Sequence, residues 1–121
     1  MKLTNADLEN INKPLDSLSK EKFPATVALS LIKALKEIAG HMVDYGKVRD
    51  TLITRYGPEK DGKPTGSINP QDPNWSEFAK EYAELLEVEV EVNIDIIKIP
   101  GADLKISPEH LMKLEKVIEI V

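Results

Sequence analysis

Four acidic side chains alternate along one short stretch of this sequence. Glu87, Glu89, Glu91 and Asp95 are separated mainly by β-branched apolar residues. In an extended chain, alternate residues lie roughly 6.6 Å apart on one face. Such a row could hold a hard cation, although a flat row converges poorly on one ion. It could instead imitate the phosphate spacing of a nucleic-acid strand and occupy a basic cleft. The interpretation that we favour is a solvated face whose like charges discourage edge-to-edge aggregation.

Other groups that could do catalytic chemistry are isolated in the sequence. The two histidines, His41 and His110, are far apart and form no His-Glu-x-x-His pair. The glycine spacings of phosphate-binding and dinucleotide-binding loops are absent, and so is the calcium-loop pattern. The chain has no cysteine, which excludes a thiol nucleophile, cysteine zinc sites and disulfides. We therefore predict a protein that is not an enzyme and that uses no metal or cofactor.

Length and charge indicate one domain with no general affinity for nucleic acid. The 121 residues carry a net charge of -5, which opposes attraction to phosphate backbones. No apolar run approaches the roughly 20 residues that a membrane span needs, and we find no secretory signal peptide. These features predict a cytoplasmic protein with no membrane partner. Residues 87–121 carry eight acidic and four basic side chains, so we expect a basic partner to meet this part.

The elements that would position the acidic row begin with a long helix predicted at residues 24–56. Apolar residues recur along it at alternating steps of four and three, and Gly57-Pro58 ends the pattern. A matching apolar stripe predicts a second helix at residues 74–86, with Asn74 as the N-cap. Because the two stripes match, we expect the helices to pack as an antiparallel hairpin.

The segment that joins these helices, residues 57–74, is rich in glycine and proline. These two types make up seven of its 18 residues, and Asp61-Gly62 predicts a turn. A loop of this length is either a connector or a surface for a partner. Lys60, Asp61 and Lys63 are the candidate contacts in the second case.

Shorter helices are predicted near both ends of the chain. Residues 1–22 carry a loose helical stripe, with Thr4 and Asp7 close to the spacing of a capping box. Pro14 interrupts this stripe, so we expect two short pieces or one kinked helix. A serine followed by proline begins the last predicted helix, at residues 107–119.

Strict period-two alternation predicts a half-buried strand at residues 87–99. Its apolar face would comprise Val88, Val90, Val92, Ile94 and Ile96. Three arrangements would pair this strand: a bend near Asn93 with short neighbours, a symmetric homodimer, or addition of a partner protein's strand. The short neighbours within the chain would be residues 1–3, 67–69 or 104–106. The predicted fold class is α+β, with a long antiparallel helical hairpin, a small β-sheet and a C-terminal helix.

The chain resembles a family of small uncharacterised proteins encoded by phages and prophages of Gram-positive bacteria. The resemblance rests on these residues: Met1-Lys2-Leu3, Lys22-Phe23-Pro24, Tyr45, Arg49, Leu52-Ile53, Arg55-Tyr56-Gly57, Phe78, Glu81, Leu85-Leu86, Glu89-Val90, Ile94–Ile99, Ile106-Ser107-Pro108, Leu111 and Leu114. It implies a phage-encoded accessory protein that acts in the infected cell or in particle assembly. The family carries no established catalytic residues that could be transferred to this chain.

These observations lead to two hypotheses about function. The first is a non-enzymatic protein–protein interaction role in phage assembly or host modulation, with a phage or host protein or a second copy as the partner. The second is inhibition of a bacterial defence nuclease by an acidic face that imitates nucleic acid. The candidate contacts are Glu87, Glu89, Glu91, Asp95, Lys60, Asp61 and Lys63.

Overall fold

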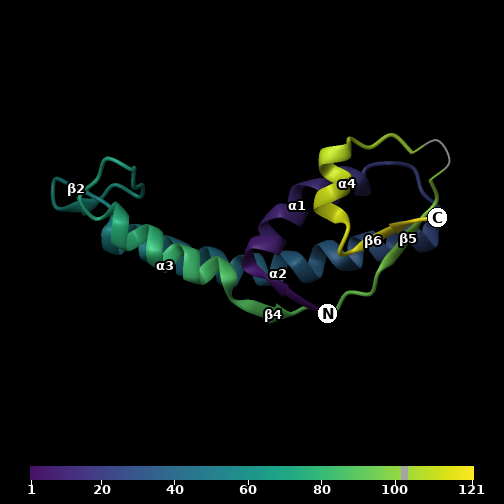
Figure 1. The fold of residues 1–121 in the computed structure, drawn as a ribbon, viewed down its shortest axis with the longest axis horizontal. Coiled ribbons are helices and arrows are strands. Elements are labelled where there is room, and N and C mark those ends of the chain that lie inside the picture. Colours follow the sequence, from purple (N-terminus) through teal and green to yellow (C-terminus); the bar gives the residue numbers. More distant parts are fainter. Residues whose placement is uncertain (102–103) are drawn as a thin grey trace.

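The computed structural model describes residues 1–101 and 104–121. Within them the fold is α+β, with four helices and three two-stranded sheets. The molecule is elongated: a helical hairpin extends from one side of a body that contains both chain ends (Figure 1). No helix in these residues is long and apolar enough to cross a membrane.

The predicted helical hairpin is formed by α2 (Ala25–Tyr56) and α3 (Trp75–Glu87), which pack against each other. Figure 1 shows α3 alongside the C-terminal half of α2, with the connecting loop at the tip. The predicted cap at Asn74 is wrong in its chemistry, because the Asn74 side chain accepts no hydrogen bond from the helix. The start of α3 is held instead by backbone hydrogen bonds of the loop.

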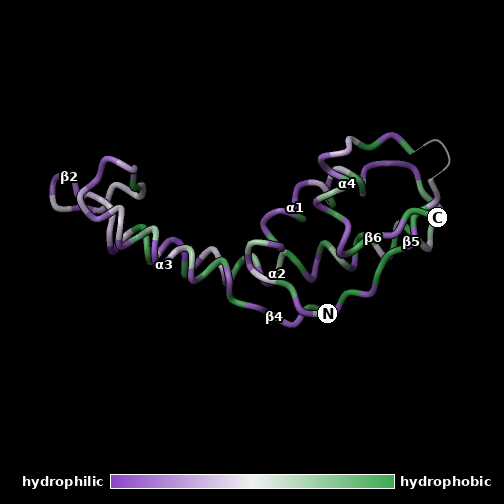
Figure 2. The backbone as a smooth tube through the Cα atoms, in the orientation of Figure 1, coloured by the Kyte–Doolittle hydropathy of each residue, from purple (hydrophilic) through white to green (hydrophobic). Residues whose placement is uncertain are grey.

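The loop at the tip contains a small antiparallel pair, β2 (Glu59–Lys60) with β3 (Lys63–Pro64). Asp61 and Gly62 join the two strands, with φ angles of 55° and 76°. Positive φ at both positions is the requirement of a tight two-residue hairpin turn, which confirms the predicted turn. Figure 2 shows that this loop is mostly hydrophilic.

The core lies between α1 (Asn5–Ser19) and the N-terminal half of α2. Leu8 and Leu15 of α1 and Leu31 and Ile38 of α2 are fully buried there. The capping box at the start of α1 is present as predicted, since Asp7 N–H donates to the Thr4 hydroxyl and Thr4 N–H donates to the Asp7 carboxylate. α1 is one helix that includes Pro14.

A second contact ties α1 to both helices of the hairpin. The Tyr45 hydroxyl on α2 donates to Glu9 Oε2 of α1 at 2.7 Å and lies 2.6 Å from the Tyr82 hydroxyl of α3. The guanidinium of Arg49 lies 5.6 Å from the centre of the Tyr45 ring. Burial and these two hydrogen bonds raise the pKa of Tyr45, so the phenol stays protonated.

The strand predicted as one unit at residues 87–99 is in fact divided. Glu87 is the last residue of α3, and two short strands follow: β4 (Glu89–Glu91) and β5 (Ile97–Ile99). β4 pairs antiparallel with β1 (Lys2–Thr4), and β5 pairs parallel with β6 (Ile118–Ile120). Of the predicted solutions, the structure therefore shows the bend with short neighbours. Residues 67–69 and 104–106 are not strands.

The predicted C-terminal helix is too long. Ser107 caps α4 (Pro108–Leu114) as expected, but the helix ends at Leu114 and residues 118–120 form β6. Val117 and Ile118 are buried, as the helical stripe implied, although both lie beyond the end of the helix. The physical reason is pairing: Ile118 and Ile120 lie opposite Ile97 and Ile99, where β-branched side chains pack well.

Candidate functional site

One edge of the segment that contains β4 and β5 is covered by the two short strands. Asn5 N–H donates to Val88 O, Val92 N–H donates to Met1 O, and Ile97 N–H donates to Val117 O. Val88 and Val92 turn their backbone groups toward β1, whereas Ile97 and Ile99 turn theirs toward β6, so the alternation shifts by one residue between the two halves. Since backbone groups alternate between the edges of a strand, Glu89 and Glu91 turn theirs to the opposite edge.

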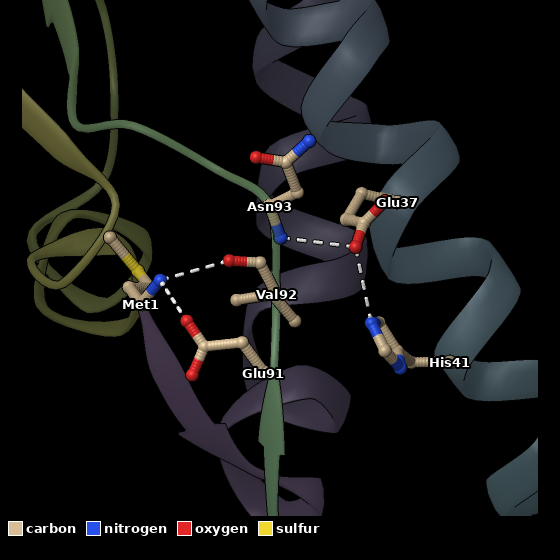
Figure 3. Close-up of polar contacts among 6 residues, drawn as sticks. All are labelled: Met1, Glu37, His41, Glu91, Val92 and Asn93. Carbon is tan, nitrogen blue, oxygen red and sulfur yellow. Dashed lines mark hydrogen bonds and ion pairs between the residues drawn. The ribbon is translucent and has the colours of Figure 1, made fainter.

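The opposite edge faces α2 at Asn93 (Figure 3). Asn93 N–H donates to Glu37 Oε1 at 3.0 Å, and the same oxygen lies 3.2 Å from His41 Nε2. The hydrogen bond from the Asn93 backbone and the contact with His41 lower the pKa of Glu37. The carboxylate of Glu37 thus takes the place that the next strand of a sheet would occupy, but only at Asn93.

Beyond Asn93 the edge is open. Within the described part of the chain, the backbone N–H groups of residues 94–96 have no hydrogen-bond partner. Residues 94–96 join β4 to β5 and belong to neither strand. The predicted apolar face also breaks here: Ile94 is buried, Ile96 is 56% exposed, and Ile97 is buried again.

A groove of about 470 Å³ separates this open edge from α2. Its floor is apolar and comprises Val27, Ala34, Ile94 and Ile97. Its rims are exposed and comprise Thr26, Ser30 and Lys33 on α2 and Asp95, Ile96 and Lys98 on the strand side. An irregular segment with unpaired backbone N–H groups on one wall and a helix on the other is an arrangement that can hold an extended peptide.

The lysines of the groove, Lys33 on α2 and Lys98 on β5, are both exposed. Neither forms an ion pair with another described residue. Asp95 contributes the opposing charge in the lining. The groove thus carries more positive than negative side chains, although the whole chain has a net charge of -5.

The four acidic residues singled out from the sequence are all exposed, but they do not act as one row. Glu87 belongs to α3, while Glu91 lies on β4 and its carboxylate contacts the Met1 ammonium at 3.1 Å. Asp95 lies beyond the bend, on the rim of the groove. No group of three or more acidic or histidine side chains in the described residues could hold a metal ion.

The other predicted contacts lie elsewhere. Lys60, Asp61 and Lys63 are exposed in the β2–β3 turn, at the tip of the hairpin (Figure 1). The groove is lined instead by the N-terminal part of α2 and by residues 93–98. The structure therefore does not bring the loop and the acidic residues together.

Sequence reasoning missed most of the groove. Thr26, Ser30 and Lys33 are ordinary polar residues on a helix surface, and their spacing carries no distinctive signal. Lys98 belongs to the segment predicted as a strand but was not among the candidate contacts. The one available signal was the run Ile94–Ile99, in which apolar residues at both 96 and 97 break the alternation.

Comparison with known proteins adds nothing to this description, because no protein-family model, curated protein or solved structure matches the chain.

Proposed function

We propose that this chain is a non-enzymatic interaction protein that binds an extended segment of a partner protein in the groove between α2 and residues 93–98. The partner segment lies beside the open edge and receives the backbone hydrogen bonds that a neighbouring strand would receive. This mode of recognition is strand addition, in which main-chain hydrogen bonds provide affinity and the groove provides selectivity.

The observation that carries the proposal is the unpaired backbone of residues 94–96 beside a groove of sufficient size. The five residues 94–98 would span at most roughly 13 Å if fully extended. The apolar floor offers burial to one or two side chains of the bound segment, and the Glu37 carboxylate closes the groove at Asn93. A short segment of about five residues therefore fits, and a long strand does not.

The resemblance to phage and prophage proteins supports a biological setting for this interaction. We infer that the partner is a phage or host protein, and that the complex acts in phage assembly or host modulation. A symmetric homodimer is the other occupant that the open edge could accept. Light scattering at high protein concentration separates the two, because a homodimer would double the measured mass. A dimer formed through this edge would leave no edge for a partner.

Two substitutions at one position test the proposal. Asp95→Pro removes one of the unpaired N–H groups of residues 94–96 and places a ring there, whereas Asp95→Ala removes only the carboxylate. Tagged versions of both variants and the wild type are expressed in phage-infected cells, and the captured proteins are quantified by mass spectrometry. We expect a partner that binds the wild type and Asp95→Ala but not Asp95→Pro, with all three unfolding at similar temperatures.

Hydrogen exchange then locates the contact in the complex with the purified partner. Binding should slow amide exchange at residues 94–98. Protection confined to residues 57–74, or a partner that Asp95→Pro retains, would contradict the proposal.

A second candidate function is inhibition of a defence nuclease, because Glu87, Glu89 and Glu91 are exposed near the junction of α3 and β4. Their charges could meet a basic nucleic-acid-binding cleft. The double variant Glu89→Lys/Glu91→Lys should abolish inhibition of a purified nuclease. Inhibition that survives this charge reversal would eliminate acidic mimicry.

A further inference from the structure

We infer that the segment bound in the groove is acidic: an extended peptide whose carboxylate side chain lies between Lys33 and Lys98. This inference rests on the proposed function, because it names the chemistry of the partner at the same groove.

The first step of the argument concerns the walls. Lys33 projects from α2 and Lys98 from β5, so the two ammonium groups belong to opposite rims of one groove. An extended segment between the rims alternates its side chains, and those that point outward from the floor pass between the lysines.

The second step concerns the charges that are already satisfied. Elsewhere on the described surface, Lys20, Lys113 and Lys116 each contact a carboxylate within 4 Å. Lys33 and Lys98, like most lysines of the chain, have no such contact with a described residue. The nearest acidic residue along the α2 wall, Glu37, is instead engaged with Asn93 and His41. Both ammonium groups are therefore available to a carboxylate of a partner segment.

The third step concerns Asp95, the acidic residue of the lining. It would weaken the binding of an acidic segment and strengthen the binding of a basic one. The substitution Asp95→Asn thus gives opposite results for the two kinds of partner. We expect Asp95→Asn to tighten binding of the acidic segment by roughly two- to fivefold, as for exposed charges.

The test uses a displayed library of random heptapeptides, selected in low salt on the intact chain. Four proteins serve as bait: the wild type, Lys33→Glu/Lys98→Glu, Asp95→Pro and the matched control Lys60→Glu/Lys63→Glu. The control makes the same charge change at the tip of the hairpin. All four are first compared by thermal unfolding.

We expect the wild type and the hairpin-tip control to enrich peptides with Asp or Glu at one position. The groove variant should instead enrich Lys or Arg there, and Asp95→Pro should enrich nothing. For a selected acidic peptide, Lys33→Glu/Lys98→Glu should lower the affinity roughly tenfold relative to the wild type. This difference should shrink in about 0.5 M salt, where the Debye length is only a few Å.

Two results would overturn the inference, and they are distinguishable. Peptides that bind the wild type but not Asp95→Pro, and that show no preference for acidic residues, would refute the acidic partner and leave strand addition intact. Peptides that ignore Asp95→Pro, or no enrichment at all, would refute the proposed function as well.

Discussion

Asp7 joins the start of α1 to the C-terminal segment through polar contacts, in addition to the apolar core that both share. This side chain accepts the Thr4 N–H at 3.0 Å and contacts Lys116 Nζ at 3.0 and 3.1 Å. We predict that Asp7→Ala lowers the free energy of unfolding by about 1.5 kcal/mol. About 1 kcal/mol of this comes from the capping interaction and about 0.5 kcal/mol from the exposed ion pair.

The assay is urea unfolding of the wild type, Asp7→Ala, Lys116→Ala and the double variant at neutral pH. Lys116→Ala alone should cost about 0.5 kcal/mol, because it leaves the capping hydrogen bond intact. The double variant should cost less than the two single variants together, since they share the ion pair. Asp7→Asn serves as a control, because its amide oxygen can still accept the Thr4 N–H.

The effect of Asp7 should depend on pH. Burial alone would raise its pKa, but the hydrogen bonds from Thr4 and the charge of Lys116 outweigh burial and hold the pKa below its usual value. A lowered folded-state pKa stabilises the fold at pH values above the unfolded pKa, and this contribution is lost as the pH falls through the folded value. The difference between wild type and Asp7→Ala should therefore shrink below about pH 4. A difference that is absent at pH 7, or that stays constant down to pH 2, would refute this reasoning.

Two further pairs of variants test other parts of the fold. Tyr45→Phe should lower the free energy of unfolding in urea by about 1 kcal/mol, because the Tyr45 hydroxyl joins Glu9 and Tyr82. Tyr82→Phe should lower it by less, and an equal or larger loss would contradict this assignment. Gly40→Ala should raise the free energy of unfolding by about 0.5–1 kcal/mol, and with it the unfolding temperature, since a methyl group there meets no atom within 4 Å. Gly57→Ala should lower stability by about 1–3 kcal/mol, because its Cβ would lie 2.5 Å from the Ile53 carbonyl oxygen; an unchanged unfolding temperature would show that this turn is not tightly packed.

The helices were predictable because their signals are local. The Thr4–Asp7 capping box, the Ser107-Pro108 start of α4 and the periodic stripe of α2 each lie within a few turns of the residues that they specify. Such signals act through hydrogen bonds and packing between near neighbours, although pairing of β6 with β5 ended α4 earlier than its stripe predicted.

The strands were less predictable because tertiary pairing decides between two local patterns. Residues 94, 96, 97 and 99 are all isoleucine, so the sequence permits the inward face to shift anywhere among them. The contact with β6 fixes the shift, because it requires Ile97 and Ile99 to face inward. Residues 117–121 carry both a helical stripe and a period-two alternation, and the same pairing selects the strand.

The candidate site follows from that shift. Exposure of the acidic residues could be read from the alternation, and the structure places them all at the surface. The groove beside Lys33 could not be predicted from the sequence, because it exists only where the segment bends between its two partner strands. No local pattern around Lys33 encodes that bend.

The pairing of β4 and β5 with the two ends of the chain also sets the order in which the parts of the fold can assemble. Met1 and Val92, which are joined by a hydrogen bond, are 91 residues apart, whereas the helical hairpin closes only the loop at residues 57–74. Local contacts form faster than distant ones, so we expect α2 to pack with α1 and with α3 before β4 and β5 pair with β1 and β6. On the ribosome, β5 remains without its partner until residues 118–120 have emerged. We expect the like charges of Glu87, Glu89 and Glu91 to repel the same segment of neighbouring chains before the fold is complete.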